Sequence, residues 1–151
     1  MKIAIDFDGT IVENQYPGIG PEMMFAFETM KALKKKGHQL ILWTYRHGKE
    51  LDEAVEFCRK NNLEFDAVNH SFLHEDFNPA NQSRKIDADI FIDDRSVGGF
   101  LGWGRIYQII HPEDRNKMVN ILDENAHTNY IKHKSLRKRI LYSLSKREGL
   151  D

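Results

Sequence analysis

The chain has 151 residues, of which 40% are hydrophobic and 30% are charged, and its formal net charge is −1. This apolar content is sufficient for one folded domain and argues against an intrinsically disordered chain. A net charge near zero creates no overall field that would select nucleic acid or a membrane surface as partner. The single cysteine, Cys58, excludes an internal disulfide and a zinc site built from cysteines.

The first residues indicate where the protein works. Residues 1–6 carry one positive charge followed by an apolar run that is too short for the apolar region of a signal peptide. No apolar stretch approaches the length that a bilayer-spanning helix needs. We therefore expect a cytoplasmic protein that does not contact the membrane.

Short apolar runs predict the strands of a sheet. In chain order they cover residues 2–7, 39–43, 65–68, 90–92 and 106–110. Nearly continuous apolar runs of this length are typical of parallel strands that are buried on both faces.

Apolar side chains at helical spacing predict helices between these strands. The first helix begins near Pro21 and ends at Gly37, because glycine suits the position just after a helix C-terminus. A second helix is predicted around residues 51–58, with Cys58 as a small buried residue on its apolar stripe. A third is predicted around residues 118–125.

Alternating strands and helices predict the α/β class. We expect a Rossmann-like three-layer sandwich with a mostly parallel central sheet and right-handed crossovers. Residues 126–147 carry seven Lys or Arg and no acidic residue, which predicts a basic C-terminal helical extension over 126–151 packed on the same domain.

Ligands bind outside the carboxyl ends of the strands in such sheets. Asp6 and Asp8 follow the first strand and lie on one side of it, because side chains alternate along a strand. Gly9 permits a turn and a close approach of the backbone to a ligand. Two carboxylates so close repel each other unless a cation lies between them or one takes a proton. A Mg²⁺ ion with oxygen ligands is the simplest solution.

Polar residues also end two other predicted strands. Thr44 offers a hydroxyl group and is followed by free backbone N–H groups, which suit phosphate oxygens. Asp93 and Asp94 end the strand at 90–92 and indicate the same cation as Asp6. Lys85, shortly before that strand, supplies a positive charge for a phosphate.

These segments together resemble the haloacid dehalogenase superfamily over residues 1–110. The segment 6–10 (DFDGT) matches its first motif, Thr44 the second, Lys85 the third, and the pair at 93–94 the fourth, in the same order. The resemblance implies that residues 1–125 form the catalytic domain.

The resemblance also implies roles for single residues. Asp6 would attack phosphorus to form an aspartyl-phosphate, and Asp8 would act as general acid and then as general base. The implied Mg²⁺ ligands are Asp6, the backbone carbonyl of Asp8, and Asp93, with Asp94 binding either directly or through water. The residues expected to bind the phosphate are Gly9, Thr44, Tyr45 and Lys85.

Members of that superfamily with large caps insert them after the first motif or after the third strand. Here the corresponding segments, 11–20 and 69–84, are too short to build a separate cap domain with its own core. The chain is therefore expected to be a capless Mg²⁺-dependent phosphatase of a small phosphorylated metabolite. A homo-oligomer that closes the open site is a further expectation.

Several alternatives stay open at this point. Arg46 and His47 are either substrate contacts or surface charges. The basic segment 126–147 allows a phosphatase of nucleic-acid ends, although nucleic acid is the less favoured partner. A third alternative is a non-catalytic module that binds a phosphorylated ligand. The glycine-rich segment 98–104 precedes no clear helical pattern, which argues against a dinucleotide site there.

Overall fold

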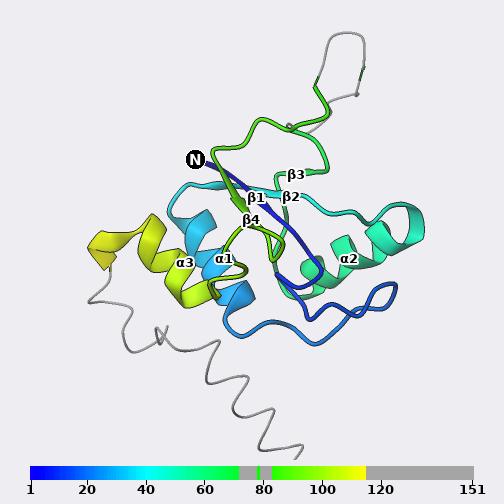
Figure 1. Cartoon of the computed structure of the whole chain (residues 1–151), viewed down its shortest axis with the longest axis horizontal. Helices are drawn as coiled ribbons and strands as arrows, with labels where there is room; N and C mark the ends of the chain where they lie inside the picture. Colours follow the sequence, from blue (N-terminus) through cyan, green and yellow to red (C-terminus); the bar gives the residue numbers. More distant parts are fainter. Residues whose placement is uncertain (72–77, 79–82, 115–151) are drawn as a thin grey trace, which may run out of the picture. The chain divides into compact units, whose positions relative to one another are not determined.

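The computed structural model describes residues 1–71, 78 and 83–114 (Figure 1). The chain divides into two compact units, Met1–Phe100 and Leu101–Asp151. None of the described helices is long and apolar enough to cross a membrane. The helix predicted around 118–125 and the basic extension predicted over 126–151 lie outside the described residues.

The first unit contains a sheet of four strands, all of them parallel. The strands are β1 (Lys2–Ile5), β2 (Gln39–Leu42), β3 (Ala67–Val68) and β4 (Ile90–Ile92), in the order β3-β2-β1-β4. The α/β class with a parallel central sheet is thus confirmed. Each of these strands lies within a predicted apolar run.

The register brings the carboxyl ends of three strands to one level. Ile5 of β1 pairs with Leu42 of β2 on one side and with Ile92 of β4 on the other. Hydrogen bonds continue one residue further, because the Asp6 amide donates to the Ile92 carbonyl (3.0 Å) and the Trp43 amide donates to the Ile5 carbonyl (2.8 Å). The residues that follow these strands therefore begin at the same edge of the sheet.

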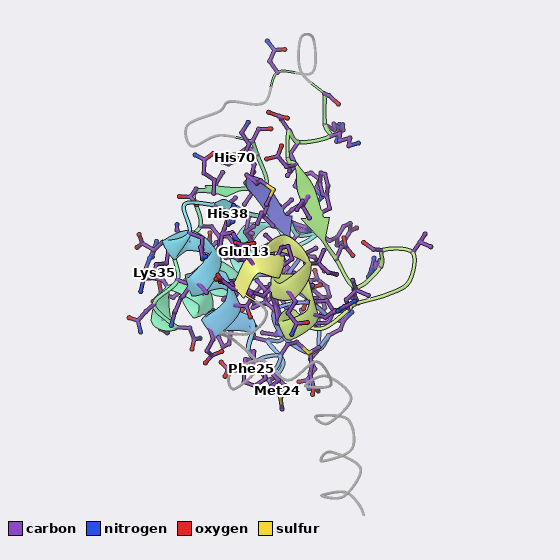
Figure 2. All side chains as sticks on the ribbon, turned by 90° about the vertical axis from the view of Figure 1, so that its left-hand side faces the viewer. Met24, Phe25, Lys35, His38, His70 and Glu113 are labelled. Carbon is purple, nitrogen blue, oxygen red and sulfur yellow. The ribbon has the colours of Figure 1, made fainter. Side chains whose placement is uncertain are left out.

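Two helices connect the strands of the first unit, α1 (Ala26–Lys35) and α2 (Gly48–Lys60). Both were predicted, but α1 begins later than Pro21 because Phe25 adopts a left-handed conformation (φ 63°) just before it. Phe25 and Lys35 mark the two ends of α1 in Figure 2. Gly37 has φ 84°, as expected of a glycine after a helix C-terminus.

The two helices pack on each other on one face of the sheet. The rings of Phe27 in α1 and Phe57 in α2 lie 5.9 Å apart, and Phe57 meets Phe7 edge-on at 6.1 Å. Cys58 is buried, which raises the pKa of its thiol to about 12 and confirms it as a core residue. A separate core cluster contains Ala4, Ile41, Ala67 and Ile86.

The described part of the second unit contradicts one predicted strand. Residues 106–110 belong to helix α3 (Trp103–Ile110), which a short 3-10 helix, Pro112–Asp114, follows. Trp103, Ile106 and Tyr107 are buried whereas Ile109 is 55% exposed, a pattern with helical spacing. The short apolar run was misleading because periodicity cannot separate a buried strand from a helix over five residues. The glycine-rich segment 98–104 therefore does lead into a helix.

The first of the two segments in which a cap could be inserted, residues 11–20, contains no cap domain. Residues 11–20 contain no helix or strand, and Val12 makes only isolated bridges, to Asp8 and to Glu22. Most of the segment 69–84 lies outside the described residues.

Candidate active site

A cavity of about 720 Å³ lies at the carboxyl edge of the sheet, within the first unit. The loops that follow β1, β2, β3 and β4 all contribute to it. Its lining residues are Asp6, Asp8, Asn14, Tyr16, Trp43, Thr44, Tyr45, Arg46, His47, Asn69, Asp93 and Arg95. In the strand order β3-β2-β1-β4, the connections after β1 lead first to one side of it and later to the other. The site lies at this topological switch point, the usual ligand position in such sheets.

Three carboxylates converge at this edge. Asp6, Asp93 and Asp94 each offer an oxygen atom, and these atoms lie within 4.8 Å of one another. The Asp94 amide donates to the Thr10 hydroxyl (3.1 Å), and Asp93 accepts a hydrogen bond from the Arg95 amide (2.7 Å). The predicted grouping of these three acids, from strands that are distant in sequence, is thus observed.

Burial and mutual repulsion make the charge of these acids costly. Burial raises the pKa of Asp6 to about 7, and the nearby Asp93, Asp94 and Asp8 raise it too. Burial and Asp93 likewise raise the pKa of Asp94. One oxygen of Asp94, Oδ1, is buried without a hydrogen-bond partner. A proton or a hard cation would relieve this cluster, and carboxylate oxygens are the ligands that Mg²⁺ prefers.

Gly9 allows the first loop to pass close to Asp94. Its φ of +89° is unfavourable for residues with a side chain, and an added Cβ would collide with the Asp94 carboxylate. Gly9 does not line the cavity. Its observed role is therefore to make room for the acidic cluster, and phosphate binding by Gly9 stays a prediction.

Asp8 lies in the same cavity, but its carboxylate has a different partner. Arg46 Nε donates to Asp8 Oδ2 and Arg46 Nη2 donates to Asp8 Oδ1, both at 2.7 Å. The Arg46 side chain is fully buried, so its interpretation as a surface charge is wrong. Because Arg46 already neutralises Asp8, the Asp8 side chain needs no cation shared with Asp6, and metal binding by the Asp8 backbone carbonyl stays a prediction.

Asn69, which was not among the predicted site residues, holds the loop between β2 and α2. It follows β3 and adopts a left-handed conformation (φ 56°), which Asn tolerates better than most residues. Its Oδ1 accepts a hydrogen bond from the Thr44 amide (2.9 Å), and its Nδ2 donates to the Arg46 carbonyl (3.4 Å). A polar residue directly after a strand was the available signal.

The loop after β2 carries three further predicted site residues. Thr44, Tyr45 and His47 line the cavity, and the Thr44 hydroxyl accepts a hydrogen bond from the Arg46 amide (3.3 Å). Tyr45 is 86% exposed, and His47 is exposed at the start of α2. Their placement at the cavity agrees with the prediction, and their contacts with phosphate or substrate stay predictions.

Lys85 is not brought to the cavity. It is exposed, its amide donates to the Ser83 hydroxyl (3.1 Å), and it does not line the cavity. Arg95, directly after the acidic pair, lines the cavity instead and was missed. Its position next to Asp94 was the available signal, since the loop after a strand end faces the site.

A second group of metal-ligating side chains lies in the second unit. Ligand atoms of His111, Glu113 and Asp114 also come within 4.8 Å of one another. These residues have protein partners, however, because His111 Nδ1 lies 2.7 Å from Glu113 and the Tyr107 hydroxyl donates to Asp114 (3.1 Å). Their arrangement therefore requires no ion.

Comparisons with known proteins found a solved structure that is similar to this chain. No family model matches the chain, and no curated protein matches it. The structure of a conserved protein from Bacteroides thetaiotaomicron matches with a TM-score of 0.70 and 53% sequence identity, covering 75% of this chain and 91% of that one. This chain belongs to the family of that protein. The membership supports the α/β fold.

Proposed function

We propose that this protein is a Mg²⁺-dependent phosphohydrolase that cleaves phosphate esters of small metabolites through a phosphate bound covalently to Asp6. The observation that carries the proposal is the convergence of Asp6, Asp93 and Asp94 within 4.8 Å of one another, beside a cavity that Asp6, Asp8 and Asp93 line. The order of these residues in the chain supports it, because it resembles that of the haloacid dehalogenase superfamily.

Three residues would hold the ion in this proposal. The oxygens of Asp6, Asp93 and Asp94 form a hard donor set, and the unpartnered Oδ1 of Asp94 fits a cation ligand. When bound, Mg²⁺ neutralises charge on the phosphate and favours the ionised form of Asp6. The Asp8 side chain is not part of this set, since it pairs with Arg46 and is not among the acids that converge within 4.8 Å.

The chemistry of the residues then follows in two steps. Asp8 starts the first step protonated, on a lone pair that Arg46 does not use. An Asp6 oxygen forms a bond to phosphorus while the bond to the ester oxygen breaks, and Asp8 gives that oxygen its proton. Asp8 next takes a proton from a water molecule, which attacks the phosphorus of the aspartyl-phosphate. Phosphate leaves, Asp6 regains its carboxylate, and Asp8 is protonated again.

The walls of the cavity suit the substrate expected here. Thr44 adds a hydroxyl group to the cavity that Asp6, Asp8 and Asp93 line, and Arg95 and His47 add basic side chains. A phosphate group fills only part of a cavity of about 720 Å³, which leaves space for a metabolite-sized alcohol. Phosphate binding by Lys85 remains a prediction that needs its exposed side chain to reach this cavity.

The proposal is tested by release of inorganic phosphate from a panel of phosphorylated metabolites and from p-nitrophenyl phosphate, with Mg²⁺ and with a chelator. We expect Asp6→Asn, Asp8→Asn or the chelator to reduce phosphate release at least about 10³-fold. Asp87→Asn is the matched control, because Asp87 is an exposed acid paired with Lys2. Unchanged turnover in Asp6→Asn would refute the assigned role.

Neither alternative function gains support from the described residues. The phosphatase of nucleic-acid ends depends on the basic segment 126–147, which lies outside them. A binding module without turnover would not need the acid that Arg46 holds at position 8. The phosphatase of small metabolites is therefore the function we retain.

A further inference from the structure

We propose that Arg46 is a positioning residue that fixes the Asp8 carboxylate and the loop at residues 16–18 as one unit. The inference rests on the proposed phosphatase function. It adds a link between the acid–base residue Asp8 and the loop at 16–18, whose Tyr16 lines the cavity. Arg46 belongs to no motif that predicted the site, and its buried guanidinium has no part in the chemistry described above.

The contact between Arg46 and Asp8 has the geometry of a rigid clamp. Two parallel hydrogen bonds of 2.7 Å join Nε and Nη2 of Arg46 to the two carboxylate oxygens. This fork-to-fork arrangement fixes the plane of the carboxylate as well as its distance, which a single bond would not do. The Asp8 side chain is only 15% exposed, so water offers little competition for its oxygens.

The same guanidinium holds the loop that follows the first motif. Arg46 Nη1 donates to the Pro17 carbonyl (3.0 Å) and Nη2 donates to the Gly18 carbonyl (2.6 Å). The guanidinium carbon lies 4.9 Å from the centre of the Phe7 ring and 5.4 Å from that of Tyr16. The Arg46 side chain thus joins the loop, through two of its backbone carbonyls, to the Asp8 carboxylate of the first motif.

This loop is also a wall of the cavity. Tyr16 lines it and is 48% exposed, so part of its ring is accessible to a substrate. A ligand that shifts Tyr16 therefore acts on the residue that orients Asp8. Asn69 restrains the same arginine from its other end, through the Arg46 carbonyl (3.4 Å).

A purely structural role and a positioning role predict different kinetics. A buried arginine that only stabilises the fold would, when replaced, reduce activity equally for every ester. A positioning role affects the proton transfer to the leaving oxygen, which matters most for a poor leaving group. The ratio of kcat/KM for p-nitrophenyl phosphate to that for benzyl phosphate separates the two, because alkoxides leave far less readily than nitrophenolate.

The experiment compares the full-length wild type with Arg46→Lys, Arg46→Gln, Asp8→Asn and the Arg46→Lys, Asp8→Asn double variant on both esters. We expect Arg46→Lys to reduce kcat/KM about 10²-fold or more for benzyl phosphate and about tenfold or less for p-nitrophenyl phosphate. In the Asp8→Asn background the same change should alter kcat/KM by less than about threefold, since Asp8 would no longer benefit from orientation.

Leu33→Ala is the control for lost stability, because Leu33 is fully buried in α1 and does not line the cavity. It should leave the ratio between the esters unchanged. If Arg46→Gln does not fold, Arg46→Lys carries the comparison. Equal losses for both esters, or a full additional loss in the Asp8→Asn background, would overturn the positioning role while leaving the phosphatase intact. A wild type that cleaves neither ester, nor any phosphorylated metabolite of the panel, would overturn both proposals.

Discussion

At the scale of single residues, the site depends on how closely Gly9 approaches Asp94. The first loop can pass the acidic cluster only because residue 9 has no Cβ and accepts a φ of +89°. A side chain at this position would displace either the loop that carries Asp8 or the strand end that carries Asp94. Gly9 therefore belongs to the site although it does not line the cavity.

Replacing Gly9 with alanine tests whether the close approach to Asp94 costs stability beyond the strain of a positive φ. We expect Gly9→Ala to lower the free energy of unfolding by at least about 2 kcal/mol, measured by urea denaturation. Gly37→Ala is the matched control, because Gly37 has φ +84° but no atom within 4 Å of an added Cβ. A loss for Gly9→Ala no greater than that for Gly37→Ala would contradict this account.

The raised pKa of Asp6 predicts how the stability of the metal-free protein changes with pH. Asp6 keeps its proton up to about pH 7 in the folded protein but loses it near its ordinary pKa of 3.8 when unfolded. The folded state therefore binds more protons between these values, and its stability falls as the pH rises through this window. Burial is the largest cause of the raised Asp6 pKa. The pKa of Asp94 is also raised, so Asp94 changes the stability in the same direction.

With a chelator present, we expect Asp6 to contribute a decrease of about 2 kcal/mol in the free energy of unfolding between pH 4.5 and pH 8, after allowance for solvent screening. Asp6→Asn should remove this contribution and flatten the profile measured by denaturant unfolding. An identical pH profile for the wild type and Asp6→Asn would show that Asp6 titrates normally.

At the scale of elements, the sequence predicted well what local patterns determine. Helices α1 and α2 and the four strands follow from apolar periodicity and glycine placement, and Asp6, Asp93 and Asp94 were expected together because parallel strands share one edge. The segment 106–110 was assigned to the wrong element because five apolar residues fit a strand or a helix equally well.

The contacts between loops could not be predicted in the same way. The pairing of Asp8 with Arg46 and the bonds from Asn69 to the loop after β2 join segments that are 38, 25 and 23 residues apart. Such pairs depend on the final packing of the loops, and no periodic pattern marks them. Lys85 matches a motif of the resembled superfamily, yet it does not line the cavity.

The loop after β2 should lose its order when Asn69 is changed. Asn69→Ala removes the acceptor for the Thr44 amide and the donor to the Arg46 carbonyl, so we expect a loss of about 1–2 kcal/mol in unfolding free energy and reduced kcat/KM. Asn69→Asp keeps the acceptor and removes only the donor, so its effect should be smaller. Equal stability of all three proteins would show that these bonds are not needed.

At the scale of the whole molecule, one unit of the chain contains every residue assigned to the site. The lining residues of the cavity all fall within residues 6–95, and the strand order places β1, with Asp6, between β2 and β4. Loops from all four strands therefore meet around Asp6, and the described segment 11–20 contains no helix or strand. The match to the conserved Bacteroides thetaiotaomicron protein supports the fold on which this arrangement rests.

Chemical capture of a phosphorylated Asp6 would demonstrate the covalent intermediate. The full-length protein is mixed with Mg²⁺ and p-nitrophenyl phosphate, quenched in acid, reduced with borohydride and mapped by peptide mass spectrometry, which reveals an acyl-phosphate as homoserine. We expect homoserine at position 6, more of it in Asp8→Asn because hydrolysis of the intermediate is slowed, and none in Asp6→Asn. Phosphate release by the wild type with Asp6 unmodified in both the wild type and Asp8→Asn would contradict the account.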